Sequence, residues 1–340
     1  KMISSIYSAS GSPLLYFIGV KYWEKSIYNY VIKNINLNEF DIIHHFNHIS
    51  FREPGYLWRI KDKCFVWGPT SGTSNIPLSF IFTMSLSEIF KNIVRNFSNF
   101  YFKNCSSKVH QASIQSSIIY TVSKQDFNYF KKKCNNVKMM LDVGGYNFKK
   151  VTTKSNNIRF LWVGRLDNLK ALDILLIALS RLGKSYKNYS LKIIGDGPKR
   201  KSFESMSKKF DLNSNITWMG NLSKEEVLKN FKNSDFLIFT SIKEAASAVV
   251  LESLSCGIPV LCHDAFGMSY AIDDKSGIKV EYKSKEKSIK EFKNKISEIL
   301  IGKVNIDKLK KGAFKRSEEL SWDSISKKIS KDYFDLLKSN

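Results

Sequence analysis

Residues 158–182 read IRFLWVGRLDNLKALDILLIALSRL. A short apolar run ends at Gly164, a polar turn follows, and apolar residues then recur with helical spacing up to Leu182. This order of buried strand, turn and helix is typical of one βα unit in a parallel sheet. The carboxy-terminal half therefore predicts a doubly wound α/β domain, because similar strand-like runs separated by helical stretches follow at 191–194, 216–219, 236–240 and 259–262.

The amino-terminal half predicts a second, incomplete α/β unit. Strand-like runs lie at 40–44, 64–67 and 117–122, and helical patterns at 15–35, 86–102 and 124–134. The first fifteen residues are polar and serine-rich, whereas a complete doubly wound domain opens with a strand and a glycine-rich turn. We therefore expect this domain to lack its first βαβ portion.

The chain of 340 residues is long enough for two domains. We predict an incomplete Rossmann-like domain over 1–145, a linker over 146–156, and a second Rossmann-like domain over 157–320. A final helix over 321–340 is expected to pack back toward the first domain. Two such domains would face each other across a cleft, which is where folds of this kind bind ligands.

Composition limits the class of protein. Hydrophobic residues make up 43% of the chain, which excludes a disordered protein. The net charge of +23 is spread over both halves and attracts nucleic acid, anionic lipid or phosphorylated small molecules, although a lysine-rich solvated surface gives the same count. No apolar run reaches the ~18 residues of a membrane span, and no signal peptide is visible.

The five cysteines are scattered and odd in number, which indicates a reducing compartment and argues against a disulfide framework. Cys256, Cys262 and His263 lie near one another in the sequence, but their spacing fits no common zinc pattern. We interpret the two thiols as buried structural residues.

Two segments follow predicted strands at the sheet edge where such folds bind ligands. Arg165 comes after the strand at 158–163 and Lys170 before the next helix, so both cations can converge on one anionic group. Gly195 and Gly197, in Gly-Asp-Gly-Pro, allow a sharp turn and a close backbone approach. Each segment alone also fits an ordinary surface loop.

A pair of carboxylates follows the strand at 236–240. Glu244 and Glu252 are eight positions apart, just over two helical turns. A helix that begins near Ser247 would place Glu244 in the preceding loop and Glu252 on the helix flank. The backbone N–H groups at Ser247 and Ala248 would then form an anion-binding site.

The order of these motifs carries a family resemblance. Gly-Arg-Leu at 164–166 with Lys170, Gly-Asp-Gly-Pro at 195–198, Trp-Met-Gly-Asn-Leu at 218–222, the two glutamates and Cys-Gly-Ile-Pro-Val at 256–260 form one ordered set. This set resembles the donor domain of the retaining glycosyltransferases of family 4, the glycosyl transferases group 1, which have the two-Rossmann GT-B fold. The amino half, with Asp-Ile-Ile-His-His at 41–45 and Trp-Gly-Pro at 67–69, is similar to a subset acting on bacterial surface polysaccharides.

The resemblance implies how a nucleotide-sugar donor would be held. Arg165 and Lys170 would bind the donor diphosphate, with the helix start at Ser247 and Ala248, and Glu252 would bind the ribose. The chain contains no Asp-x-Asp sequence, which argues against a metal-bridged diphosphate. We therefore expect neither a metal nor a cofactor, because two cations and a helix start can stabilise the departing diphosphate.

The resemblance also implies which residues lie nearest the reacting sugar. Glu244 would lie beside the reacting carbon, and His44 or His45 would contact the donor sugar from the amino-terminal domain. For each histidine, a purely structural position is the alternative. The residues that would border the nucleobase are Gly195, Gly197, Met219 and Gly220.

The chain departs from the family pattern at three positions. Where the family has glycine, this chain has Ala171, Ala245 and Ser247. Loss of glycine restricts close backbone approach to a ligand.

These observations predict a retaining, metal-independent hexosyltransferase that moves a sugar from a nucleotide donor to a lipid-linked glycan acceptor in capsule or O-antigen biosynthesis. It would work in the cytoplasm, peripherally on an anionic membrane face. The alternatives are a non-catalytic nucleotide-sugar-binding partner, or an inactive truncated homologue. A nucleic-acid binder is disfavoured because the chain shows no nucleic-acid-binding motif.

The stretch at 80–108 interleaves aromatic and basic residues. This pattern fits an amphipathic helix lying in a membrane interface, and equally a core helix with a solvated basic side. The residues are Phe82, Phe90, Phe97, Phe100, Tyr101 and Phe102, with Lys91, Arg95 and Lys103.

Overall fold

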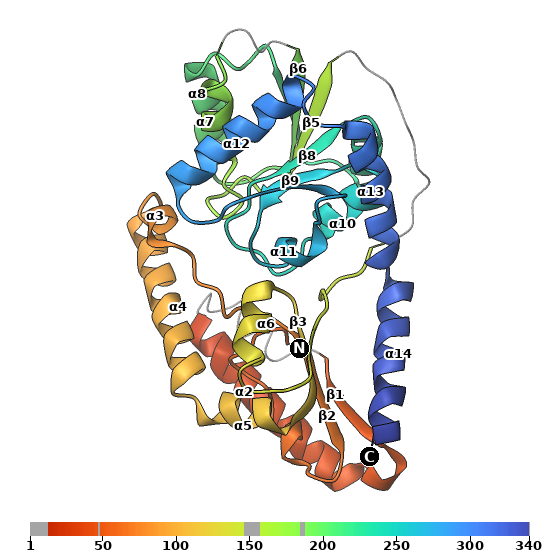
Figure 1. Cartoon of the computed structure of the whole chain (residues 1–340). Helices are drawn as coiled ribbons and strands as arrows, with labels where there is room; N and C mark the ends of the chain where they lie inside the picture. Colours follow the sequence, from red (N-terminus) through yellow and green to blue (C-terminus); the bar gives the residue numbers. More distant parts are fainter. Residues whose placement is uncertain (1–12, 47, 146–156, 184–187, 340) are drawn as a thin grey trace. The chain divides into compact units, whose positions relative to one another are not determined.

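The computed structural model describes residues 13–46, 48–145, 157–183 and 188–339, and it divides into two units (Figure 1). The amino-terminal unit takes in the described residues up to Asn75, then Arg95–Met140, and those from Ile329 onward. The carboxy-terminal unit takes in Ile76–Val94 and Leu141–Lys328. The predicted linker at 146–156 lies outside the described residues.

The carboxy-terminal unit is built on a six-stranded parallel sheet of order β10-β9-β8-β5-β6-β7. Five of its strands are the predicted ones; the sixth, β10, was missed because its four residues include a glycine and a lysine. The strands are β5 (Ile158–Val163), β6 (Tyr189–Ile194), β7 (Ile216–Gly220), β8 (Phe236–Phe239), β9 (Val260–His263) and β10 (Gly277–Val280).

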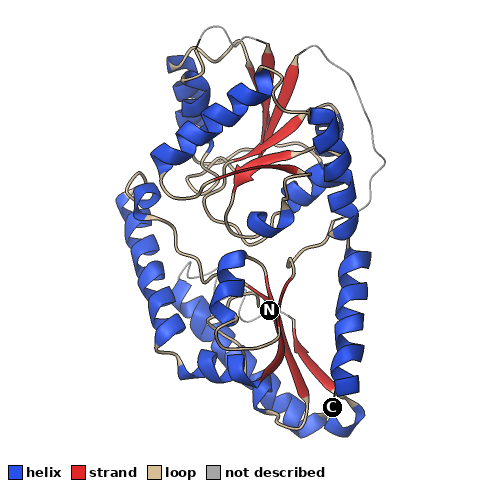
Figure 2. Ribbon diagram, viewed as in Figure 1, coloured by secondary structure: helices blue, strands red, loops and turns tan. Residues whose placement is uncertain are grey.

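Helices lie on both faces of this sheet, as expected for a doubly wound unit (Figure 2). They are α7 (Leu172–Ser180), α8 (Arg200–Lys209), α9 (Lys224–Lys232), α10 (Ala248–Ser255), α11 (Met268–Ala271), α12 (Lys285–Leu300) and α13 (Ile306–Glu319). The predicted helical stretches all form, with ends within a few residues of those expected.

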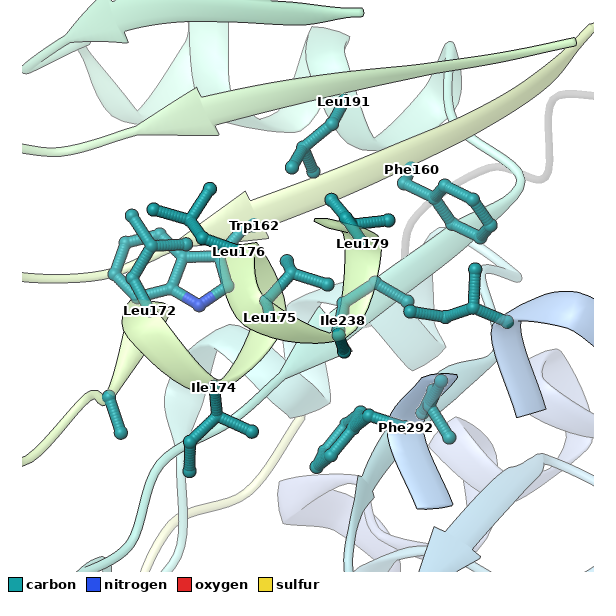
Figure 3. Packing of buried hydrophobic residues seen from close by; sticks show 14 of the residues in the cluster. Phe160, Trp162, Leu172, Ile174, Leu175, Leu176, Leu179, Leu191, Ile238 and Phe292 are labelled. Carbon is teal, nitrogen blue, oxygen red and sulfur yellow. The ribbon is translucent and has the colours of Figure 1, made fainter. Parts of the chain in front are cut away.

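The main core of this unit lies between the sheet and α7, α8 and α12. Six of the nine residues of α7 are buried, because the helix is apolar on nearly every side. Figure 3 shows Leu172, Leu176 and Leu179 packed near Trp162 and the strand side chains. The stretch that predicts the fold thus also forms the centre of its core.

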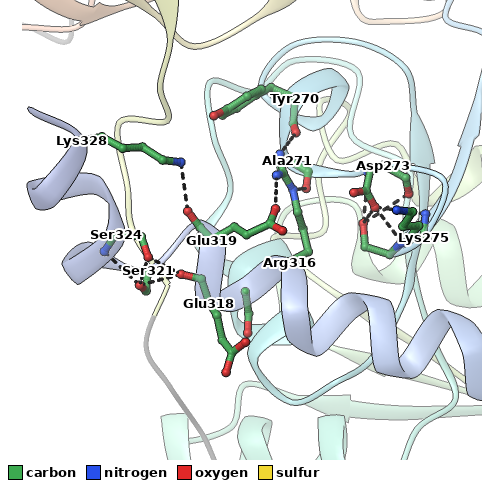
Figure 4. A network of polar contacts seen from close by, with 12 residues as sticks. Tyr270, Ala271, Asp273, Lys275, Arg316, Glu318, Glu319, Ser321, Ser324 and Lys328 are labelled. Atoms are coloured by element: carbon green, nitrogen blue, oxygen red, sulfur yellow. Dashed lines mark hydrogen bonds and ion pairs between the residues drawn. The ribbon is translucent and has the colours of Figure 1, made fainter. Parts of the chain in front are cut away.

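The end of α13 is fixed by a polar network (Figure 4). The Arg316 guanidinium donates hydrogen bonds to the backbone carbonyls of Tyr270, at 2.6 Å, and Ala271, at 3.0 Å. It also pairs with Glu319 at 2.7 Å. These contacts satisfy carbonyls at the end of α11 that have no partner further along that helix.

The amino-terminal unit has a four-stranded parallel sheet of order β1-β2-β3-β4. Three strands were predicted; β4, with three residues, was too short to recognise. The strands are β1 (Ile42–His45), β2 (Cys64–Thr70), β3 (Ser116–Thr121) and β4 (Val137–Met139). The helices are α2 (Pro13–Asn34), η1 (Leu37–Glu39), η2 (Leu57–Arg59), α5 (Ser107–Gln115) and α6 (Lys124–Phe130).

Three further helices complete the fold: α3 (Leu78–Ile81), α4 (Leu86–Asn104) and α14 (Trp322–Ser339). The second half of α14 contacts strands of the amino-terminal unit. Asp332 accepts a hydrogen bond from the Tyr120 hydroxyl at 2.7 Å and pairs with Lys138 at 2.5 Å. Burial and the bond to Asp332 raise the pKa of Tyr120, so this hydroxyl stays a donor.

Helix α4 buries two of its asparagines and exposes most of its apolar residues. Asn99 is fully buried and accepts hydrogen bonds from the Arg52 guanidinium, and Asn92 is also buried. In contrast, Leu86, Phe90 and Phe97 are 86%, 70% and 72% exposed among the described residues. We call the outward face the α4 stripe; it comprises Leu86, Phe90, Ile93, Val94, Phe97, Phe100 and Tyr101.

The second interpretation of the sequence pattern, a core helix with a solvated basic side, is therefore wrong, because most of the aromatic residues are exposed. Of the aromatic residues in that pattern, only Phe102 is half-buried, in contact with the core of the amino-terminal unit. None of the described helices combines the length and the apolar character needed to cross a bilayer.

The amino-terminal unit also buries an unusual carboxyl group. Glu24 of α2 is 1% exposed, and its Oε1 atom has no hydrogen-bond partner among the described residues. The His45 ring lies close to this atom, with its Nε2 3.7 Å from Oε1. Burial raises the pKa of Glu24 to about 7, although Lys108 opposes the shift.

The raised pKa of Glu24 predicts a pH-dependent loss of stability. Between about pH 4.5 and 7 the folded state holds a proton that the unfolded state has released, so this group makes the fold less stable as the pH rises through that window. We expect Glu24→Gln to raise the free energy of unfolding by about 2 kcal/mol relative to wild type at pH 8 and by little at pH 5.

Thermal unfolding of both proteins across this pH range is the measurement. The histidines are present in both proteins, so the difference between the two melting curves reports the change at position 24. A difference that stays constant with pH would show that Glu24 is ionised throughout.

Candidate functional site

The candidate site lies in the carboxy-terminal unit, at the point where the order of the strands in the six-stranded sheet reverses. Strands β5 and β8 pair side by side, with Phe160 opposite Phe236, but β5 leads on to β6 and β8 leads on to β9 on the other side. The loops after β5 and β8 therefore diverge at the carboxyl edge, and such a switch point is the usual ligand site of an open α/β sheet. The segment 164–171 follows β5, and the segment 240–247 follows β8.

These two loops are tied together by hydrogen bonds. The Thr240 hydroxyl donates to the carbonyl of Lys170 at 2.8 Å, and the Ile242 N–H donates to the carbonyl of Leu169 at 2.9 Å. The Trp162 indole N–H in turn donates to the Thr240 hydroxyl at 3.1 Å. Buried side chains of the core thus fix the position of the loop that carries the basic residues.

Lys170 and Glu244 form an ion pair across the two loops. The Ser241 hydroxyl donates to the same carboxylate oxygen at 3.3 Å, and the Lys170 ammonium lies 5.5 Å from the centre of the Phe239 ring. The sequence predicted these residues as separate contacts to diphosphate and sugar. It gave no sign of their pairing, because the contact depends on β5 and β8 being neighbours.

Arg165 is not part of this pair. Its side chain is 70% exposed, and its closest charged partner is Asp167 at 3.6 Å. Asp167 also accepts hydrogen bonds from the backbone N–H groups of Leu169 and Lys170, each at 3.0 Å. The guanidinium is therefore held loosely beside a loop that is itself well ordered by hydrogen bonds.

The two carboxylates lie where their spacing predicts. Glu244 is in the loop and Glu252 is inside α10, which begins at Ala248 with Ser247 as its N-cap. Neither Ser247 nor Ala248 donates a backbone hydrogen bond to another described residue, so both N–H groups are available to an anion. Burial raises the pKa of Glu252, and Lys224 acts against that shift.

Asp142 is a residue of this site that sequence reasoning missed. Its carboxylate accepts a hydrogen bond from the Ala246 N–H at 3.1 Å, and burial raises its pKa despite that bond. The carbonyl of Ala245 is held by the N–H of Gly267 at 2.8 Å. Only the spatial contact identifies Asp142, because it precedes this loop by about a hundred positions.

The glycines of Gly-Asp-Gly-Pro are required by contact between loops. A Cβ on Gly195, which has φ of +126°, would lie 2.0 Å from the carbonyl oxygen of Gly164, and one on Gly197 would lie 2.5 Å from that of Leu166. The carbonyl of Gly220, at the end of β7 next to Met219, accepts a hydrogen bond from the Gly195 N–H at 2.7 Å. These segments thus pack edge to edge; their predicted place beside a nucleobase stays a prediction.

Arg200 also lies at this edge and was not anticipated. Its guanidinium pairs with Asp196 at 3.0 Å and with Glu204 at 2.9 Å. It is the side chain that a Cβ on Gly220 would meet, at 3.5 Å. The signal in the sequence was a basic residue three positions after Gly197, which the helix start at α8 brings back toward the loop.

Ala171 adopts the backbone conformation that glycine favours. It precedes α7 with φ of 49° and ψ of 48°, in the left-handed region, and its side chain is buried. An L-residue there carries strain of about 1 kcal/mol. Ala171 thus replaces the glycine of the family pattern but keeps the left-handed backbone conformation after Lys170.

The two candidate histidines belong to the amino-terminal unit, at the end of β1. His44 donates through Nε2 to the carbonyl of Gly68 at 2.6 Å, so its Nδ1 accepts from the Tyr333 hydroxyl at 2.5 Å. His45 is buried, and burial lowers its pKa to about 4. Both rings are therefore neutral near pH 7, and the choice between them stays open.

The buried-thiol interpretation of the cysteines is confirmed for Cys256 and Cys262. Both are free and buried, and burial raises their pKa values to about 11 and about 12. His263 has protein partners on both ring nitrogens, the Ser241 carbonyl and the Ser288 hydroxyl. In the described part of the chain, no group of three His, Cys, Asp or Glu side chains is arranged to hold a metal ion.

Comparison with known proteins supports a family assignment. Residues 146–316, half of the chain, match the family model of glycosyl transferases group 1. Protein CapJ of Staphylococcus aureus is 27% identical over 158 residues, which cover 46% of this chain and 39% of that protein.

A second curated relative is N-acetylgalactosamine-N,N'-diacetylbacillosaminyl-diphospho-undecaprenol 4-alpha-N-acetylgalactosaminyltransferase of Campylobacter jejuni. It is 27% identical over 212 residues, 61% of this chain and 54% of that enzyme. The matched region thus spans less than two-thirds of either relative.

The solved apo structure of the lipopolysaccharide outer core galactosyltransferase WaaB is also similar. It has a TM-score of 0.63 at 17% identity, over 91% of this chain and 79% of that one. This likeness shows the fold, two parallel α/β units of the GT-B type, as the sequence predicted. With the family model matching half of its length, the chain belongs to the glycosyl transferases group 1 family.

Proposed function

We propose that this protein is a retaining glycosyltransferase that transfers a sugar from a nucleotide-sugar donor. The observation that carries the proposal is the Lys170–Glu244 pair at the β5–β8 switch point, beside the open start of α10. One cation and one carboxylate are in contact here, and the N–H groups of Ser247 and Ala248 follow Glu244 by three and four residues in the chain. A donor needs these groups, because its diphosphate is anionic and its reacting sugar develops positive charge.

In this proposal the basic groups stabilise the leaving diphosphate. Arg165 turns its exposed guanidinium to the phosphates, and Lys170 exchanges Glu244 for a phosphate oxygen. The N–H groups of Ser247 and Ala248 add the positive end of the α10 dipole. These groups supply the positive charge that transfer requires, so we propose that the reaction proceeds without a metal ion.

The carboxylates have separate roles. Glu244, released from Lys170, lies beside the reacting carbon, where a negative charge stabilises the oxocarbenium-like transition state. Glu252 accepts hydrogen bonds from the ribose hydroxyls, and Asp142 holds the backbone of the Glu244 loop through Ala246. His44 or His45 contacts the donor sugar as a neutral imidazole.

The proposed acceptor is a lipid-linked glycan of a bacterial surface polysaccharide, at the cytoplasmic face of the membrane. The name of the Campylobacter relative includes a diphospho-undecaprenol acceptor, and the α4 stripe offers a surface for lipid. We propose that the stripe inserts at the bilayer interface while the net charge of +23 attracts anionic headgroups. A second copy of the chain is the competing occupant, and the experiment below separates the two.

Nucleotide binding tests the donor site. Calorimetry of the EDTA-treated protein with UDP-, GDP- and ADP-sugars should detect one nucleotide class. Arg165→Ala and Glu252→Ala should each weaken binding by about tenfold or more, because each removes a charged hydrogen-bond partner. Glu298→Ala, which removes a surface carboxylate paired with Lys295, should bind as wild type does.

A well-folded protein that binds none of these nucleotide sugars contradicts the proposal. Binding without sugar release in the presence of lipid-linked acceptors supports the alternative of a non-catalytic nucleotide-sugar-binding partner.

Vesicle binding tests the α4 stripe. Phe97→Ser should reduce association with vesicles that contain anionic lipid by about tenfold, because an inserted phenylalanine contributes ~1.5–3 kcal/mol. Phe334→Ser removes a phenylalanine of similar exposure, 65%, from α14 and should leave association unchanged. Equal loss in both variants argues against insertion of the stripe, and a concentration-dependent dimer lost only in Phe97→Ser identifies a second copy as the occupant.

A further inference from the structure

The segment Ile76–Val94 precedes the linker by about fifty residues, yet it belongs to the carboxy-terminal unit. Ile76, Phe80 and Ile81 are at most 1% exposed and are part of the core cluster that contains Trp162 and α7. This segment includes α3 and the first half of α4. Its side chains support both loops of the candidate site, the loop after β5 and the loop after β8.

Phe80 supports the loop after β8. Its ring stacks on Tyr282, with centroids 5.0 Å apart and an angle of 18° between the planes. The Tyr282 hydroxyl donates to the carbonyl of Ile242 at 2.7 Å, two residues before Glu244. The stack therefore holds a hydrogen-bond donor in place beneath the Glu244 loop.

His263 gives the same loop a second support. Phe80 meets its ring edge to face, with centroids 6.1 Å apart. A carbonyl only accepts, so Nδ1–H donates to Ser241 at 3.2 Å, and Nε2 accepts from the Ser288 hydroxyl at 2.9 Å. Ser241 in turn contacts Glu244 through its hydroxyl. Two consecutive carbonyls of the loop are thus held by groups that pack on Phe80.

Glu88 supports the loop after β5. Its Oε2 atom accepts hydrogen bonds from the Asn168 side-chain amide at 2.7 Å, from the Ser85 hydroxyl at 2.7 Å and from the Ser85 N–H at 3.2 Å. Asn168 lies between Arg165 and Lys170 in this loop. Burial raises the pKa of Glu88, but these bonds outweigh it and leave the pKa below the ordinary value.

Lys285, the first residue of α12, connects the segment Ile76–Val94 to α7. Its ammonium pairs with Asp173, in the first turn of α7, at 2.6 Å and donates to the Thr83 hydroxyl at 3.2 Å. A small cavity of about 20 Å³ remains among Phe80, Met84, Asn168 and Ile242. This volume holds at most one water molecule, so the segment and the two loops fit together closely.

We propose that Phe80 and Glu88 are positioning residues for the donor site. Phe80 fixes the loop that carries Glu244, and Glu88 fixes the loop that carries Arg165 and Lys170. Neither residue touches the donor; each acts through Tyr282, His263 or Asn168. The proposal rests on the proposed function, because it assigns these loops to nucleotide-sugar binding.

The first test measures loop mobility without any ligand. We expect Glu88→Ala to speed hydrogen exchange of the 165–170 amides by about tenfold, and Phe80→Leu to do so for the 241–246 amides, because each removes a tertiary contact. Glu298→Ala and Phe203→Leu are the matched controls; Phe203 is a buried phenylalanine of the same core outside this network. Unchanged exchange in both test variants overturns the proposal.

The second test measures the dissociation constant of the nucleotide that wild type binds. Glu88→Ala and Phe80→Leu should raise it about fivefold, whereas Phe203→Leu should lower the melting temperature similarly and bind normally. Glu88→Gln should restore binding, since its amide oxygen still accepts from Asn168. Glu88→Ala combined with Asn168→Ala should be no weaker than Asn168→Ala alone.

The two failures are distinguishable. If wild type binds no nucleotide, the proposed function fails while hydrogen exchange still decides whether the two residues order the loops. If wild type binds and both test variants bind equally well, the positioning role fails and the proposed function stands.

Discussion

The pairing of β5 with β8 is the constraint on which the candidate site depends. These strands are separated by two βα units in the chain, yet the register of Phe160 with Phe236 sets them side by side. The pairing brings Lys170 against Glu244 and lets Thr240 and Ile242 bond to the backbone of the neighbouring loop. A shift of either strand along its neighbour would separate the charged pair and break those hydrogen bonds.

The surroundings of this pair show how the loops are kept in place. The two loops contain no helix or strand, so their backbone N–H and C=O groups must find hydrogen-bond partners elsewhere. Two such partners come from distant parts of the chain: Asp142, before the linker, accepts from the Ala246 N–H, and Tyr282, after β10, donates to the Ile242 carbonyl. Side chains of the loops are held as well, Thr240 by Trp162 and Asn168 by Glu88 of α4. Loops that carry charged groups of a catalytic site need such support, because small displacements of these groups weaken transition-state stabilisation strongly.

Helix α4 links two features of the chain that otherwise have no connection. Its first turn supplies Glu88, which bonds to Asn168 in the loop after β5, and its outward face carries the α4 stripe. A surface helix of a globular protein usually buries its apolar residues and exposes its polar ones, and the exposed phenylalanines and buried asparagines of α4 reverse this pattern. The buried asparagines are tolerated because they have partners: Asn99 bonds with Arg52 and Asn75, and Asn92 with the carbonyl of Glu88.

Much of this protein was determined by the sequence alone, because the signals are local. Strand and helix periodicity fixed five of the six strands of the larger sheet, and motif order indicated the family. The spacing of Glu244 and Glu252 placed them correctly in a loop and a helix, since helical geometry depends only on nearby residues. Two strands were missed: β4 has only three residues, too few to show periodicity, and β10 includes a glycine and a lysine among its four.

Only the tertiary structure decided which side chains meet. The Lys170–Glu244 pair, the role of Asp142 and the support from Phe80 and Glu88 all join residues tens to hundreds of positions apart. The direction in which α4 faces could not be read from its pattern either, because an amphipathic sequence specifies two faces but not which one the rest of the chain covers. That choice is made by the partners available on the fold, and here Arg52 and Asn75 bond to the polar face and leave the aromatic face exposed.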